Sequence, residues 1–174
     1  MTTPSDGLLE AILDSYQRNN AILLNLLHAL PEGGMNFRAI EGSQSVAVQI
    51  SHIQNTRLFW LGQVAPEFRE GLLQLFRQDG DDWLAERDPA RIEEALKQSA
   101  QAVCDAVRSR LETGQPMRGE HASYDHPVLL LQHMLWHEGY HFGQIKLALK
   151  AAGQVWGDEQ EEKVVWSLWR KEIW

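Results

Sequence analysis

The segment 133-HMLWHEGYHFGQI-145 carries three histidines spaced four residues apart, His133, His137 and His141. Successive residues of an α-helix are about 100° apart, so this spacing turns by only about 40° per step and places all three imidazoles on nearly the same face. Two imidazoles on adjacent turns can bind one metal ion at roughly 2.0–2.1 Å. Three on one straight helix reach a single ion less easily, so we expect one of them to have another role. The alternative is that all three are ordinary polar residues of a partly buried helix.

Four long helices are predicted, because apolar side chains recur at helical spacing and residues that begin or end helices stand at their limits. The predicted helices cover residues 8–30, residues 43 or 45 to 64, residues 89–114 and residues 125 to about 152. Ser43 or Ser45 can cap the second helix, and Asp125 can cap the fourth, with Pro127 in its first turn. The fourth helix carries the three histidines.

The segments between these helices are less regular. A further short helix is predicted over residues 67–78, and 79-DGDDW-83 is predicted to form a turn. That turn lacks the carboxylate spacing of a calcium loop, so we expect it to have no metal role. The loop over residues 114–124 is the longest connection that we predict. A terminal helix is predicted to start at Asp158, with Glu161 in capping position, and to continue through Trp169.

The predicted fold class is all-α, because no stretch shows a convincing alternation of apolar and polar residues. Its simplest architecture is a four-helix bundle with an additional C-terminal helix, formed by residues 1–174 as a single domain. Several tryptophans fall close to the C-terminus, where simple packing is their expected role and a pocket or a dimer contact is the alternative. These are Trp156, Trp166, Trp169 and Trp174.

The composition narrows the class of protein. A net charge of −8 without a basic cluster opposes binding to nucleic acid, which depends on Lys and Arg contacts to phosphates. No window approaches the roughly 18 apolar residues of a membrane span, and residues 1–14 do not resemble a secretory leader, so we expect a cytoplasmic protein without a membrane partner. The single cysteine, Cys104, excludes an internal disulfide and lies at helical spacing with apolar residues. A small buried core residue is therefore its expected role, rather than a nucleophile.

A third metal ligand should come from the inward face of another helix, because bundles build metal sites from facing helices. His52 is the best candidate. In 45-SVAVQISHIQNTRLFWLG-62 it is flanked by apolar residues that point it toward the interior, where an unpaired imidazole would be costly. The other histidines, His28, His121 and His126, are expected to be surface or capping residues.

Two anchors and their order give the chain a resemblance to the DinB-like superfamily of metal-binding helical bundles, which includes YfiT-type thiol transferases. One anchor is the histidine of the second helix, within 51-SHIQNTRLFW-60, and the other is 137-HEGYHFGQI-145. The resemblance spans nearly the whole chain. It implies that His52, His137 and His141 bind a divalent metal. Many relatives have Arg or a similar polar residue after the last ligand, whereas this chain has Phe142, which puts an inherited substrate contact in doubt.

The resemblance also bears on the residues around the motif. His133 matches a histidine that relatives often carry one turn before the pair, and we expect it to support the site without binding the metal. Gln144 shares the face of His137 and His141, so it could hold a water or substrate; the alternative is a hydrogen bond to a neighbouring helix. Glu138 and Tyr140 point to other sides of the helix, and spacing alone gives neither a catalytic role.

Three neutral histidines with one open position are typical of a catalytic rather than a closed structural ion. Such an ion can activate a bound water or thiol as a nucleophile. The resemblance favours a thiol, because some relatives transfer a low-molecular-weight thiol such as bacillithiol or mycothiol to an electrophile. A small-thiol S-transferase acting on a small molecule is therefore the first hypothesis, with a metal-activated hydrolase as a close variant.

Two other hypotheses remain open at this point. The chain could bind metal without catalysis, for sensing or buffering, or its histidines could be structural in a dimerising bundle. Imidazole ligands suit several divalent metals, with Zn, Ni and Fe as the expected choices. A homodimer is also left open, because an exposed apolar helix face could form one and relatives are often dimeric.

Overall fold

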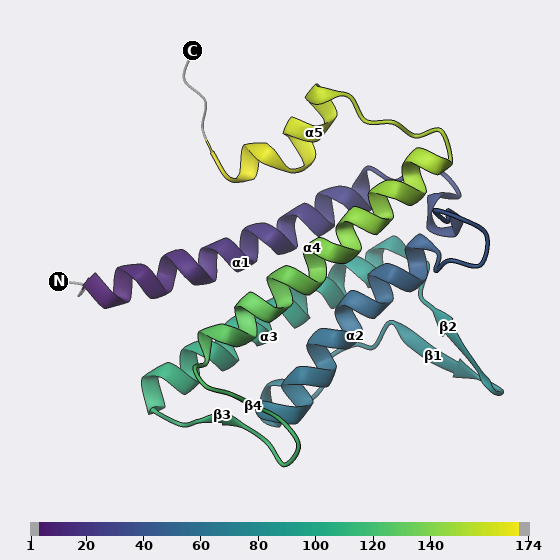
Figure 1. Cartoon of the computed structure of the whole chain (residues 1–174). Helices are drawn as coiled ribbons and strands as arrows, with labels where there is room; N and C mark the ends of the chain where they lie inside the picture. Colours follow the sequence, from purple (N-terminus) through teal and green to yellow (C-terminus); the bar gives the residue numbers. More distant parts are fainter. Residues whose placement is uncertain (1–3, 171–174) are drawn as a thin grey trace.

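The computed structural model describes residues 4–170, and within this range four long helices pack along one another (Figure 1). The bounds of these helices are α1 (Pro4–His28), α2 (Val46–Val64), α3 (Pro89–Thr113) and α4 (Val128–Ala151). Helix α1 contacts α3 and α4, α2 contacts α3 and α4, and α3 also contacts α4. The predicted all-α class is confirmed in that the fold is mostly α-helical, with only small two-stranded sheets. Trp174 lies outside the described residues.

Short elements connect the long helices and follow the last of them. They are the 3-10 turns η1 (Gly34–Asn36), η2 (Pro66–Phe68) and η3 (Trp166–Leu168), the strands β1 (Phe76–Asp79), β2 (Asp82–Ala85), β3 (Met117–Arg118) and β4 (Ser123–Tyr124), and the helix α5 (Asp158–Val164). Strands β1 and β2 pair antiparallel, as do β3 and β4. No helix of the described range has both the length and the apolar character that crossing a membrane requires.

The helix predicted over residues 67–78 is wrong. The turn η2 and the start of strand β1 form there instead, and Gly71 between them has a positive φ of 74°, which a continuing helix cannot accommodate. The chain then enters strand β1, whose register pairs Phe76 with Ala85 and Asp79 with Asp82. The predicted turn is confirmed at Gly80, which has a φ of 62°. The expectation of no strands fails at both hairpins, because each is too short to show an alternating pattern.

Of the helix starts predicted at Ser45, Asp125 and Asp158, one differs from the structure. The cap at Ser45 is confirmed, because its hydroxyl accepts a hydrogen bond from the Val48 backbone N–H. The cap at Asp125 is wrong: α4 begins at Val128, and its backbone N–H donates to Nδ1 of His126. Helix α5 does begin at Asp158, although Glu161 makes no cap there and instead pairs with Lys146. The terminal helix also ends at Val164 rather than continuing, with η3 following it.

The core is formed by two groups of buried apolar residues, one toward each end of the long helices. The first includes Leu61, Val103 and Met134, and the second includes Ile53 and Ile145. A third, smaller group attaches the C-terminal segment to α1; its buried members are Ile22, Val164 and Val165. Cys104 is buried within the first group, as predicted.

The C-terminal tryptophans differ in their surroundings. Trp156 is half-buried beside the second and third core groups, and the Lys146 ammonium lies 4.0 Å from its ring centroid. Trp166 and Trp169 are partly exposed, at 47% and 41% of their surface. Packing therefore accounts for Trp156, whereas the other two retain open faces.

Candidate metal centre

The three histidines expected to bind metal, His52, His137 and His141, come together where α2 packs against α4. We call these three side chains the triad. His52 lies in the middle of α2, and His137 and His141 lie one turn apart on α4. One ligand atom from each of these side chains lies within 4.8 Å of the others. Nε2 of His137 is 3.2 Å from Nε2 of His52. Two helices that contact each other thus place residues 85 positions apart in the sequence within ligand distance.

The electrostatic setting keeps these imidazoles neutral. Burial lowers the pKa of His52 below its usual value. Burial, and secondarily the neighbouring His52, does the same for the pKa of His137. Burial, with His137 and His52 close by, lowers the pKa of His141 to about 4. A neutral imidazole has one nitrogen lone pair to offer, so all three rings can act as ligands at neutral pH.

A metal ion fits this group of side chains. Two imidazole nitrogens bound to one tetrahedral ion at roughly 2.0–2.1 Å would be about 3.4 Å apart. The 3.2 Å between the Nε2 atoms of His52 and His137 is close to that separation. Nδ1 of His137 is also buried without a hydrogen-bond partner in the described part of the chain. A buried polar atom without a partner is costly, but a metal ion held through Nε2 would not pair with Nδ1, so the fit rests on the separation of the Nε2 atoms.

Gln49 orients the third histidine. Its Oε1 lies 3.0 Å from Nδ1 of His141, and both side chains are buried. A carbonyl oxygen only accepts, so His141 donates from Nδ1 and keeps the lone pair on Nε2. Sequence reasoning did not single out Gln49. The available signal was its spacing, because it lies three residues before His52 on nearly the same face of α2.

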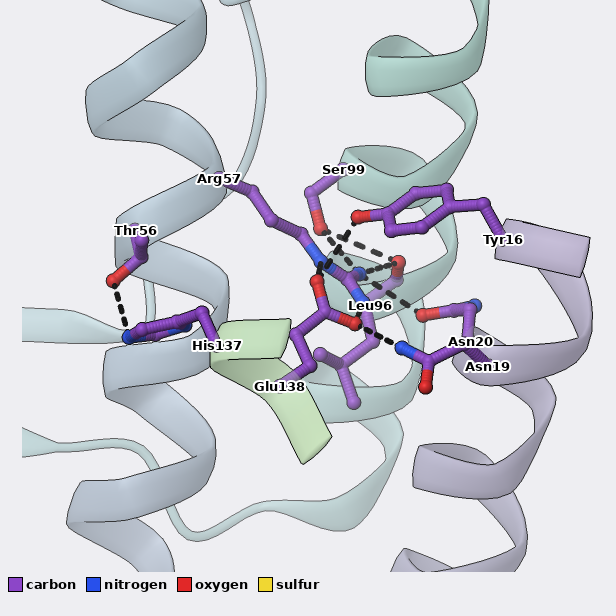
Figure 2. A network of polar contacts seen from close by, with 9 residues as sticks. All are labelled: Tyr16, Asn19, Asn20, Thr56, Arg57, Leu96, Ser99, His137 and Glu138. Atoms are coloured by element: carbon purple, nitrogen blue, oxygen red, sulfur yellow. Dashed lines mark hydrogen bonds and ion pairs between the residues drawn. The ribbon is translucent and has the colours of Figure 1, made fainter. Parts of the chain in front are cut away.

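Thr56 lies one helical turn after His52 on α2, and its buried side chain approaches α4. Its hydroxyl oxygen is 3.5 Å from Nε2 of His137 (Figure 2). This contact is at the long limit of a hydrogen bond. Thr56 therefore lies beside the triad without being held tightly by it.

His133 lies outside the group of three. Its Nδ1 is 2.7 Å from the hydroxyl of Tyr124, and its ring centroid is 5.1 Å from that of Trp60. Burial raises the pKa of Tyr124 to about 12 and lowers the pKa of His133, so the phenol donates and the neutral imidazole accepts. His133 thereby connects α4 to the β4 hairpin and to α2.

The remaining residues of the motif take separate positions. Gln144 is half-buried on α4, and no hydrogen bond joins it to the triad within the described residues, so its role stays a prediction. Phe142 packs against the apolar groups that include Trp156. Tyr140 is 59% exposed, and its ring centroid is 5.1 Å from that of His141.

Glu138 points away from the histidines, as predicted, and enters a buried polar network with Arg57 (Figure 2). Arg57 is fully buried and Glu138 is 1% exposed. The sequence analysis did not foresee this ion pair. Its only signal was a charged residue on the inward side of each helix, at positions where buried charge requires a partner.

Comparison with known proteins adds one finding. A model described as the DinB family matches residues 1–160 of the chain. The matched region contains the four long helices and all three histidines of the triad. Comparison with curated proteins and with solved structures gives no significant match.

Proposed function

The chain belongs to the DinB family, and from that premise we propose that it is a metal-dependent enzyme that transfers a small thiol to an electrophile. His52, His137 and His141 would hold the metal, a divalent transition metal such as Zn, Ni or Fe. The observation that carries the proposal is the convergence of one ligand atom from each of these histidines within 4.8 Å.

A divalent ion at this site would supply Lewis-acid chemistry, which lowers the pKa of a coordinated thiol or water toward neutrality. The chain's own contribution is the arrangement of the ligands. Three neutral imidazoles leave a fourth position for an exogenous group. Gln49 holds the ring of His141 in one orientation and one tautomer.

A thiol from solution would provide the nucleophile. The only cysteine of the chain, Cys104, is buried, and burial raises the pKa of its thiol to about 11. A thiol in that state is a poor nucleophile at neutral pH. In the proposed reaction, the sulfur of the small thiol loses its proton to solvent and bonds to a carbon of the electrophile. The leaving group departs from that carbon with the bonding electron pair.

The predicted homodimer remains a prediction, and α4 offers a place to test it. Large apolar side chains recur along the outer face of this helix and are 43% to 80% exposed. They are Leu129, Trp136, Tyr140 and Leu147. A second copy covering this face would be detected by sedimentation, and loss of association in Trp136→Glu would locate the contact.

The first experiment measures metal content by elemental mass spectrometry in protein purified without a histidine tag or chelator. We expect about one equivalent of a transition metal in the wild type and a loss in His137→Ala. His121→Ala is the matched control, because His121 is exposed and lies outside the group of three. Little metal in the wild type, with no uptake from Zn, Ni or Fe salts, would reject metal binding and favour structural histidines.

Turnover then separates the remaining alternatives. Wild-type protein loaded with metal is assayed with bacillithiol, mycothiol and simple thiols against a panel of electrophiles. Thiol-dependent product that is lost in His137→Ala supports the transferase. Hydrolysis without any thiol would replace it with a metal-activated hydrolase. Metal binding with neither reaction would favour a sensing or buffering protein.

A further inference from the structure

We propose that the buried Arg57–Glu138 ion pair positions the metal ligands, by fixing how α2 and α4 face each other beside the triad. This inference rests on the proposed metal binding by the three histidines. It assigns a function to two residues that touch neither the metal ligands' ring nitrogens nor the exposed surface. Arg57 and Glu138 are positioning residues, because they would act through His52 and His137.

The ion pair is bidentate and fully buried. Nε and one terminal nitrogen of Arg57 donate to the two carboxylate oxygens of Glu138, each at 2.7 Å. Both side chains have no solvent exposure. A two-point contact between a planar guanidinium and a carboxylate fixes direction as well as distance. It therefore restrains both the separation and the rotation of the two helices that carry it.

Each half of the pair is placed beside a part of the candidate site. Glu138 directly follows His137, and Arg57 directly follows Thr56, whose hydroxyl oxygen is 3.5 Å from Nε2 of His137. Adjacent helical residues point about 100° apart. Because Glu138 is directed into the core, the side chain of His137 lies on the side of α4 that faces α2, where it approaches His52.

The network also anchors the pair to the other two long helices (Figure 2). From α1, the hydroxyl of Tyr16 and the amide of Asn19 donate to Glu138, at 3.0 and 2.6 Å. Arg57 donates to Oδ1 of Asn20 on α1 and to the backbone oxygen of Leu96 on α3, both at 2.9 Å. All four long helices thus converge on one polar cluster next to the triad.

Stability alone does not account for such a pair. Removing two charges from water is costly, and apolar residues of similar volume at such positions are often as stable or more stable. Apolar packing is tolerant of small shifts, whereas the bidentate contact allows one relative orientation. An ion pair that fixes the orientation of α2 relative to α4 is useful at this place, because histidines from both helices must come within bonding distance of one metal ion.

The test uses the double variant Arg57→Met/Glu138→Leu, because a single substitution would leave one buried charge without its partner. Co²⁺ serves as the metal probe. Three quantities are measured: Co²⁺ affinity, the visible absorption spectrum of bound Co²⁺, and thermal unfolding of the metal-free protein. We expect cooperative unfolding to be retained, affinity to fall by about 10-fold to 100-fold, and the spectrum to change.

Two further variants separate positioning from general stability. Arg110→Met removes another buried arginine, one that bonds to Glu67 and to the Val64 backbone oxygen at the end of α2. We expect it to lower thermal stability and leave Co²⁺ affinity and spectrum unchanged. Arg57→Lys keeps the charge but loses the two-point contact, so we expect an affinity between those of the wild type and the double variant.

Wild-type Co²⁺ affinity and spectrum in the double variant would overturn the inference and leave the proposed function standing. If the double variant does not fold, Arg57→Lys decides: weakened Co²⁺ binding supports positioning, and unchanged binding overturns it. Failure of the proposed function is visible separately, because the wild type itself would then bind no Co²⁺, which overturns both.

Discussion

Nδ1 of His141 on α4 lies 3.0 Å from Oε1 of Gln49 on α2, and both side chains are buried. An amide oxygen can only accept, so the hydrogen bond sets the tautomer of the imidazole and leaves Nε2 with the lone pair. One side chain of α2 thereby prepares a ligand that belongs to α4. Partners of this kind are as much a part of a metal site as the ligands themselves.

Replacing Gln49 by Leu should weaken metal binding without abolishing it. The imidazole of His141 would lose the acceptor that fixes its tautomer, and we expect affinity for Zn²⁺ to fall by about 10-fold to 100-fold. Isothermal titration calorimetry measures this. Gln54→Leu is the matched control: Gln54 is buried on the same helix and donates to the Leu73 backbone oxygen, 2.5 Å away. Equal affinities in the two variants would contradict the assigned role of Gln49.

Substitution of His133 by Ala should leave metal stoichiometry unchanged. His133 accepts from the hydroxyl of Tyr124 and contacts the ring of Trp60, and it is not part of the group formed by the other three histidines. Loss of the hydrogen bond should lower the free energy of unfolding by about 1 kcal/mol. Urea unfolding and elemental mass spectrometry test the two statements. A metal content as low as that of His137→Ala would show that His133 is a ligand.

The buried thiol of Cys104 should contribute to a loss of stability at high pH. Burial raises the pKa of its thiol from 9.0 to about 11, so the folded protein holds a proton that the unfolded chain releases in this range. The contribution of the protonated thiol to the free energy of unfolding is complete below about pH 9 and is lost as the pH rises through about 11. Accordingly, the free energy of unfolding should fall less steeply from pH 9 to 11 in Cys104→Ala than in the wild type.

Alkylation provides a second measurement on the same thiol. Iodoacetamide at pH 8 should modify the native protein far more slowly than the protein in urea, because only the thiolate reacts and the native thiol is buried. The unfolded sample is the internal control, since Cys104 is the only cysteine. Equal rates in the two samples would show that the thiol is accessible and would reopen its use as a nucleophile.

A methyl group at Gly119 should destabilise the protein. A Cβ at this position would lie 1.6 Å from the backbone oxygen of Gln63, so the β3–β4 hairpin would have to move away from α2. We expect a loss of roughly 1–3 kcal/mol in the free energy of unfolding. Gly139→Ala is the contrasting control: a Cβ there would have no neighbouring atom within 4 Å, and alanine in a helix should add about 0.5–1 kcal/mol. Chemical denaturation distinguishes these opposite signs.

The long helices and the convergence of three histidines were both accessible from the sequence. Apolar residues at helical spacing report one face of each helix, and this face is set locally by the geometry of the backbone. His52 was found because an imidazole among apolar neighbours on α2 requires a partner. The same reasoning failed at residues 67–78 and at Asp125. In the first place, the positive φ of Gly71 prevents a helix from continuing. In the second, the side chain of His126 accepts the hydrogen bond from the first backbone N–H of α4.

The amino-acid sequence is sufficient to predict the helical class, the extent of the long helices, and which histidines share a face. These follow from the periodicity of the backbone, which acts over neighbouring residues. That Gln49 accepts from His141, and that Arg57 pairs with Glu138, 81 residues away, is visible only in the folded protein. Such partners depend on the rotation and separation of two packed helices. Those quantities are fixed by contacts from all four long helices together, and no local pattern records them.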